Sequence, residues 1–245
     1  MSIPDIAKAP ESAGQTKAGL RYRIDGTIQQ TLLVDLAAGQ TIFSDAGAMS
    51  WMSASIAMNT YASGGIGGLL KRAFSGATLF VVDFTAERGP GHVAFSADFP
   101  GKVLPFELEP GRSVVMHKHA FLCAEKTVQL DVFFTRRFGT GLFGGEGFVL
   151  QKLTGPGGVF AELDGDAIEY ALKPGETMRV EPGHVAMFEE TVQFDTEMIQ
   201  GFTNVLMGGE GLFLATLTGP GRIWLHSLTP SKVAHRVAEY LPGRK

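Results

Sequence analysis

Two histidines separated by a single residue, His117 and His119, have the types and spacing best suited to chemistry in this sequence. Alternate side chains of a β-strand share one face, so two imidazoles at this spacing can bind the same metal ion. Glu125 follows His119 along the chain and adds a carboxylate as a candidate third ligand. The alternative is that both histidines lie on a surface turn without a metal, and the spacing alone leaves the two interpretations open.

Nucleophile chemistry has little support in the sequence. The single cysteine, Cys123, lies in the apolar run Ala120-Phe-Leu-Cys-Ala, and apolar surroundings raise the pKa of a thiol rather than activate it. The glycine run that starts at Gly64 lacks the Gly-Lys-Ser/Thr ending of a phosphate-binding loop. We therefore predict a structural cysteine, no catalytic residues and no cofactor, which argues against an enzyme.

An internal repeat indicates which secondary-structure elements position the histidines and the cysteine. Residues 142–158 (LFGGEGFVLQKLTGPGG) align with residues 206–222 (LMGGEGLFLATLTGPGR), and a turn glycine recurs at Gly39, Gly111 and Gly175. Short apolar or alternating runs, separated by Gly and Pro-Gly pairs, predict antiparallel β-strands. We predict one all-β domain over residues 20–228, built from three repeats of roughly 65 residues (about 20–95, 96–163 and 164–228).

A helix is predicted after the β domain, over residues 229–241. Thr229 can cap it, Pro230 suits the first helical position, and Val233, Val237 and Leu241 fall on one face. We expect this face to pack over an open end of the β domain.

Composition excludes several classes of protein. Hydrophobic residues make up 44% and charged residues 19% of the chain, which excludes global disorder. The net charge of −4 argues against a nucleic-acid partner. The first 19 residues hold no signal-peptide core and are expected to be flexible, and no apolar run is long enough to span a bilayer. We predict a soluble, cytoplasmic protein.

Several motifs together resemble a known family. They are residues 47–53 (GAMSWMS), the Gly-rich stretch 64–75, residues 121–125 (FLCAE) and the duplicated Leu-Thr-Gly-Pro-Gly. Over about residues 20–240, the chain resembles the bacterial branch of the altered inheritance of mitochondria twenty-four family, long catalogued as a domain of unknown function. The resemblance implies a double-stranded β-helix-like barrel or sandwich related to the tryptophan attenuator protein, and a homotrimer. It also implies mitochondrial relatives linked to inner-membrane organisation, but no catalytic residues.

A second resemblance concerns the histidines. Gly111, His117, His119 and Glu125 resemble the first metal motif of cupins, which share the double-stranded β-helix architecture. The second cupin motif requires a further histidine, and the nearest candidate, His184, has the wrong spacing. A cupin-like metal protein therefore remains an alternative, and a nucleic-acid binder, suggested by the attenuator-like architecture alone, is a second one.

Three segments at matching positions of the repeats combine large apolar side chains with glycine, and two of them add paired basic residues. These candidate interaction residues are Leu69, Leu70, Lys71, Arg72, Phe74, Arg136, Arg137, Phe138, Leu142, Phe143, Phe202, Leu206 and Met207. Such apolar density requires burial, for which the candidates are a trimer interface, an anionic membrane surface, or a small apolar ligand or another protein. We favour a non-enzymatic oligomeric scaffold or adaptor.

The predicted trimer can be tested by size-exclusion chromatography with light scattering. Because one chain has a mass of 26.2 kDa, we expect a species of roughly three times that mass. A particle of 26.2 kDa at micromolar concentration would exclude the trimer and leave the apolar segments in need of another partner.

Overall fold

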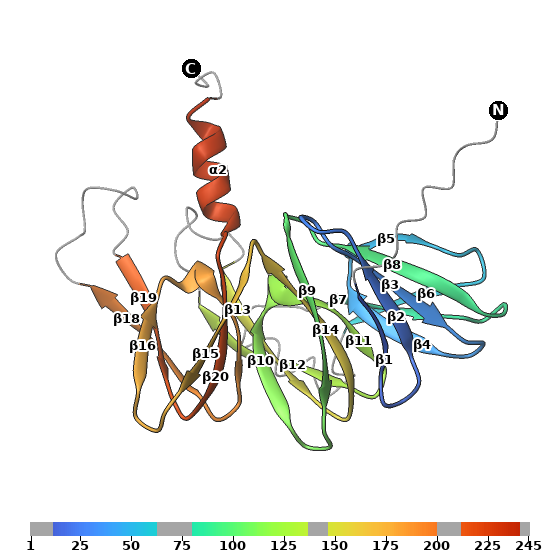
Figure 1. The fold of residues 1–245 in the computed structure, drawn as a ribbon, viewed down its shortest axis with the longest axis horizontal. Coiled ribbons are helices and arrows are strands. Elements are labelled where there is room, and N and C mark those ends of the chain that lie inside the picture. The colour runs from blue at the N-terminus through green and yellow to red at the C-terminus, as the bar shows by residue number, and fades with distance from the viewer. Residues whose placement is uncertain (1–11, 63–79, 137–146, 200–211, 241–245) are drawn as a thin grey trace.

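The computed structural model describes residues 12–62, 80–136, 147–199 and 212–240 (Figure 1). These residues form an almost entirely β structure with one short α-helix, and every pair of named strands is antiparallel. The prediction of short antiparallel strands followed by a C-terminal helix is therefore confirmed.

The strands fall into an N-terminal hairpin and three groups of six, which we call units 1, 2 and 3. The hairpin consists of β1 (Ser12–Gln15) and β2 (Arg21–Asp25). Unit 1 comprises β3 (Thr31–Leu36), β4 (Thr41–Asp45), β5 (Met49–Met52), β6 (Ala57–Ala62), β7 (Phe80–Thr85) and β8 (Gly91–Ser96). Unit 2 comprises β9 (Gly101–Leu108), β10 (Ser113–His117), the 3-10 turn η1 (Lys118–Ala120), β11 (Phe121–Glu125), β12 (Gln129–Arg136), β13 (Phe148–Thr154) and β14 (Gly157–Asp164). Unit 3 comprises β15 (Ala167–Leu172), β16 (Thr177–Val180), the 3-10 turn η2 (Pro182–His184), β17 (Val185–Glu189), β18 (Gln193–Ile199), β19 (Leu212–Thr218) and β20 (Gly221–His226).

All three units pair their strands by the same scheme. The sixth strand of each unit lies between the first and the third, and the fifth lies between the second and the fourth. Even the register irregularity in the third strand recurs, between Met49 and Trp51, between Phe121 and Cys123, and between Val185 and Met187. Equivalent residues of the three units can therefore be assigned from the pairing itself.

Neighbouring units share sheets. The second strand of one unit pairs with the third strand of the next, as β4 with β11 and β10 with β17. Four sheets result: sheet A (β1-β2-β3-β8-β5), sheet B (β6-β7-β4-β11-β14-β9), sheet C (β12-β13-β10-β17-β20-β15) and sheet D (β16-β19-β18). Figure 1 shows the units side by side, with unit 1 at the right and unit 3 at the left.

The hydrophobic core is divided in the same way as the sheets. One cluster centres on unit 1 with Phe84 and Phe95, a second on unit 2 with Met116 and Phe121, and a third on unit 3 with Phe188. Each cluster also takes residues from an adjacent unit, because the shared sheets present side chains on both faces.

Part of the segment predicted to be flexible is ordered. Residues 12–15 form β1, and β2 extends sheet A beyond β3, so the prediction for residues 1–19 is wrong for the described part of that segment. The reason is burial, since Thr16 and Leu20 are 7% and 2% exposed and the Thr16 hydroxyl donates to Glu125 of sheet B.

The C-terminal helix α2 (Pro230–Ala238) begins as predicted, with the Thr229 hydroxyl accepting a hydrogen bond from the Lys232 amide at 3.3 Å. None of its residues is buried, and it projects away from the sheets in Figure 1. The prediction that its apolar face packs over the β domain is therefore wrong. The first turn is tied to the body by the ion pair between Lys232 and Glu181 at 2.8 Å, whereas Val237 is 51% exposed.

The recurring turn glycine adopts a backbone conformation that is unfavourable for other residues. Gly39, Gly111 and Gly175 have φ values of 81°, 74° and 77°, a region that costs other residues roughly 1–2 kcal/mol. No atom lies within 4 Å of a Cβ placed on Gly175, so a substitution there meets strain but no clash.

We expect Gly175→Ala to lower the free energy of unfolding by about 1 kcal/mol, measured by urea denaturation. Gly175→Asn should cost less, because asparagine tolerates positive φ better than alanine does. Equal losses for the two variants would point to a lost contact instead of backbone strain.

Candidate functional site

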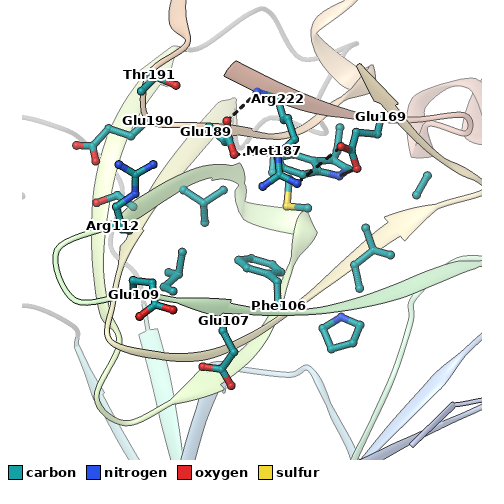
Figure 2. Close-up of a pocket in the computed structure, with 17 residues that line it drawn as sticks. Phe106, Glu107, Glu109, Arg112, Glu169, Met187, Glu189, Glu190, Thr191 and Arg222 are labelled. Atoms are coloured by element: carbon teal, nitrogen blue, oxygen red, sulfur yellow. Dashed lines mark hydrogen bonds and ion pairs between the residues drawn. The ribbon is translucent and has the colours of Figure 1, made fainter. Parts of the chain in front are cut away.

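A cleft of about 530 Å³ lies between β9, at the edge of sheet B, and strands β15, β17 and β20 of sheet C (Figure 2). Its apolar surface comes mainly from Leu104, Phe106, Ala167, Met187 and Trp224. Its charged residues are Glu107, Glu109, Arg112, Glu169, Glu189, Glu190 and Arg222.

Paired charges hold the wall of the cleft that sheet C provides. The Arg222 Nε atom lies 2.9 Å from a Glu189 carboxylate oxygen, and its guanidinium lies 5.1 Å from the centre of the Trp224 ring. The Trp224 indole donates a hydrogen bond to Glu169 at 2.9 Å, which fixes the ring orientation. Figure 2 shows Glu169, Glu189 and Arg222 together on one side of the cavity, with Phe106 opposite them. Both glutamates are therefore held by partners on the same wall of the cleft.

The equivalent groove between units 1 and 2 is already filled. The strand registers relate Glu189, Met187, Trp224, Arg222, Glu169 and Ala167 of the cleft to Glu125, Cys123, Phe160, Gly158, Pro105 and Val103 of sheet B. Against this second set lies the N-terminal segment. The Thr16 hydroxyl donates to Glu125 at 2.6 Å, and the Tyr22 ring packs edge-on against Phe160 with centroids 4.9 Å apart. The cleft is thus the counterpart of a site that the chain fills with its own residues.

Glu125 has a structural role that recurs in each unit. Its Oε2 atom accepts a hydrogen bond from the Gly158 amide at 2.7 Å, as Glu189 accepts one from the Arg222 amide at 2.9 Å. In unit 1 the hydroxyl of Ser53 accepts from the His92 amide at 3.0 Å. These contacts occupy the carboxylate that the sequence suggested as a third metal ligand.

The structure places His117 and His119 close together, but one side chain is buried and the other is exposed. Their ring centroids lie 5.2 Å apart, and His117 stacks on Phe148 at 5.0 Å. His117 is buried, and desolvation lowers its pKa well below the usual range, whereas His119 is exposed on η1. The interpretation of two surface histidines is therefore wrong for His117. Within the described ranges, no three His, Cys, Asp or Glu side chains are grouped to hold a metal ion.

Cys123 is fully buried, and burial raises the pKa of its thiol well above the usual range. This confirms the prediction of a structural cysteine. The neighbouring Glu162 lies on β14 and raises the thiol pKa further.

Buried ionisable groups on β14 and β20 were missed by sequence reasoning. Burial, followed by the negative charges of Asp98 and Asp164, raises the pKa of Glu162 to about 8. Burial, followed by His184, lowers the pKa of His226 to about 4, and its Nδ1 accepts from the Asp164 amide at 2.9 Å. Glu162 and Asp164 occupy alternate positions that would face solvent on a one-sided sheet, but both faces of β14 are covered. The sequence alone does not indicate that these two carboxyl groups are buried, because their burial depends on how the sheets stack.

The predicted interaction residues fall almost wholly outside the described residues. Of that set, only Arg136 belongs to a described strand, where it ends β12. The three segments join the fourth and fifth strands of their units, and their contact with a trimer partner or a membrane stays a prediction. Among the described residues, no helix has the length and apolar character needed to cross a membrane.

The fold and the cleft define a class of protein: an antiparallel β structure of three like-paired units, with a groove between two of them. The chain belongs to the family described as mitochondrial biogenesis AIM24, whose model matches residues 22–228. It is 27% identical over 232 residues to an uncharacterized protein of Streptococcus pyogenes serotype M6, covering 91% of this chain and 92% of that protein. A crystal structure of a Streptococcus pyogenes protein from structural genomics matches with a TM-score of 0.72 and 23% identity. That match covers 91% of this chain and all of the solved one, and shows a shared fold.

Glu162 supplies a test of the buried charges. An ordinary glutamate ionises near pH 4.5, whereas folded Glu162 ionises near pH 8, so the folded protein binds more protons between these values. This group therefore stabilises the fold fully below about pH 4.5, and its contribution is lost as the pH rises through 8.

We expect Glu162→Gln to make the melting temperature less sensitive to pH between 5 and 8 than that of the unmodified protein, with the largest relative gain at pH 8. Glu87→Gln, at an exposed glutamate, is the matched control and should leave the profile unchanged. Parallel profiles for Glu162→Gln and the unmodified protein would contradict the assignment.

Proposed function

We propose that the protein is a non-enzymatic scaffold or adaptor that binds an extended, basic polypeptide segment in the cleft between units 2 and 3. The observation that carries this proposal is the counterpart groove, which holds residues 16–24 of the chain itself. A groove of the same strand architecture, lined by equivalent positions, is suited to a ligand of the same kind.

The residues that differ between the two grooves indicate which side chains the bound segment carries. Trp224 replaces Phe160 and presents a larger aromatic face, held in place by the hydrogen bond from its N–H to Glu169, which suits an aromatic or arginine side chain. Five glutamates and two arginines line the cleft, and Lys17 and Lys152 pair with Glu109 and Glu190, so the small excess of negative charge that remains favours a basic segment. The N-terminal segment that fills the other groove carries Lys17, Arg21 and Arg23 and is basic in the same sense.

Side chains, more than backbone pairing, would hold the segment. At the outer edge of β9, the Val103 amide donates to the Gln30 side chain at 2.8 Å, and Pro105 has no amide hydrogen. A bound segment therefore finds an incomplete ladder on β9 and gains most from Trp224, Phe106 and the carboxylates. This favours an adaptor with moderate affinity over a permanently occupied site.

Oligomerisation belongs to the same proposal. A homotrimer would present three such clefts, and multiple weak sites raise the overall affinity for a partner that carries several segments. A metal enzyme or a nucleic-acid binder has less support, since the described residues offer paired charges and an aromatic wall instead of a ligand set or a basic face.

The proposal can be tested with a synthetic peptide of residues 14–25 (GQTKAGLRYRID) as the probe. The chain has two tryptophans, so in Trp51→Phe the emission reports on Trp224 alone. We expect a saturable change of emission with the peptide, and about tenfold weaker binding, or 1.4 kcal/mol, when Glu169→Gln and Glu189→Gln are combined.

A scrambled peptide of the same composition and a peptide with glutamate in place of its basic residues are the controls. A response of equal size to all three peptides, or none up to millimolar concentration, would reject the cleft as a polypeptide site.

A further inference from the structure

The junctions between units obey one register. At the first junction Ile42 pairs with Glu125 and Phe43 with Ala124. At the second junction Val114 pairs with Glu189 and Val115 with Phe188, which are the equivalent positions. The same two strands of the repeat therefore recognise each other twice, in the same alignment.

Units 1 and 3 each contain one strand of the kind that joins units, but without a partner strand from another unit. Among the described residues, β5 pairs only with β8 and β16 pairs only with β19, so each strand has one open edge. β5 is the third strand of unit 1 and β16 is the second strand of unit 3, the two kinds of strand that join units inside the chain. Figure 1 places β5 at the right end and β16 at the left end, so they do not meet within one molecule.

We propose that β16 of one copy pairs with β5 of a second copy, in the register of the internal junctions. Carried over from those junctions, this register pairs Met178 with Ser53, Arg179 with Met52 and Val180 with Trp51. Sheet D of one copy and sheet A of the next then form one continuous sheet, like sheets B and C. The partner is a second copy of this chain, and the contact is head-to-tail.

Burial of the equivalent strands supports this pairing. The residues equivalent to Trp51 are Cys123 and Met187, which are 0% and 3% exposed, whereas Trp51 is 48% exposed. β11 and β17, each joined to a neighbouring unit, are almost wholly buried, but β5 holds no buried residue. β5 and β16 thus have the exposure of junction strands whose partner is missing.

The edge of β5 also lacks the usual protection against pairing. Its sequence, Met-Ser-Trp-Met, has no charged residue and no proline, which are the devices that keep open edges apart. Proteins that leave such an edge open risk uncontrolled association, so a specific partner strand is the physically economical solution.

Head-to-tail contacts close into a ring when the rotations at the junctions add up to a full turn, and otherwise extend into a filament. This inference goes beyond the cleft and does not depend on it, because β5 and β16 contribute no residue to the cleft.

The register can be tested by disulfide trapping. Met52→Cys and Arg179→Cys are made in separate preparations, since directly opposite residues on antiparallel strands meet the distance that a disulfide requires. The native Cys123 is buried and stays in place. After mixing and mild oxidation, we expect a covalent dimer on a non-reducing gel that contains one chain of each kind.

Thr177→Cys is the matched control, because it lies on the same strand and face as Arg179 but two residues out of register. We expect its yield with Met52→Cys to be several-fold lower. No mixed dimer, or equal yields for the two pairs, would overturn the proposed register.

A second variant keeps the test independent of cysteine chemistry. Trp51→Lys places a charge within the proposed junction, opposite Val180, and should lower the mass measured by light scattering to that of one chain, 26.2 kDa. Tyr240→Lys, at a residue 74% exposed beyond α2, should leave the mass unchanged. An unchanged mass for Trp51→Lys, with its circular dichroism intact, would overturn the proposal even if the peptide test of the cleft succeeds.

Discussion

The pairing of one sixth strand with two neighbours is the constraint on which the rest of the structure depends. In each unit this strand lies between the first and third strands and satisfies backbone groups on both of its edges. The irregularity of the third strand recurs at the same place in all three units, so the register admits no slip without turning core side chains to the wrong face. Because the third strand then meets the second strand of the preceding unit, the sheets run continuously through the chain.

Shared sheets make each unit incomplete by itself. A strand such as β14 has both faces covered, so its polar alternation buries Glu162 and Asp164 and moves their pKa values far from the ordinary range. The groove at the first junction is covered by the N-terminal hairpin, and the groove at the second is the cleft lined by Trp224. The candidate site is thus a consequence of the repeat and of having one hairpin for two grooves.

The same logic explains why motif-based reasoning did not point to the cleft. His117 and His119 do lie together, but Glu125 is bound to an amide that every unit offers to the equivalent position. Glu169, Glu189 and Arg222 carry no motif at all. They lie on three different strands, and only the pairing of β20 with both β15 and β17 brings their side chains to one wall.

The sequence alone determined the class of secondary structure, the repeated turn glycines, the burial of Cys123 and the start of the C-terminal helix, because each depends on residues close together in the chain. Gly111 and Gly175 require positive φ wherever the fold places them, and Thr229 caps the helix that follows it. Tertiary structure decided which strand edges meet and that Thr16 and Leu20 are buried. It also decided that α2 projects from the sheets and that a cleft opens beside β9. These outcomes depend on how twisted sheets stack and overlap, and residues far apart in the chain, such as Phe106 and Trp224, acquire a common role only through that stacking.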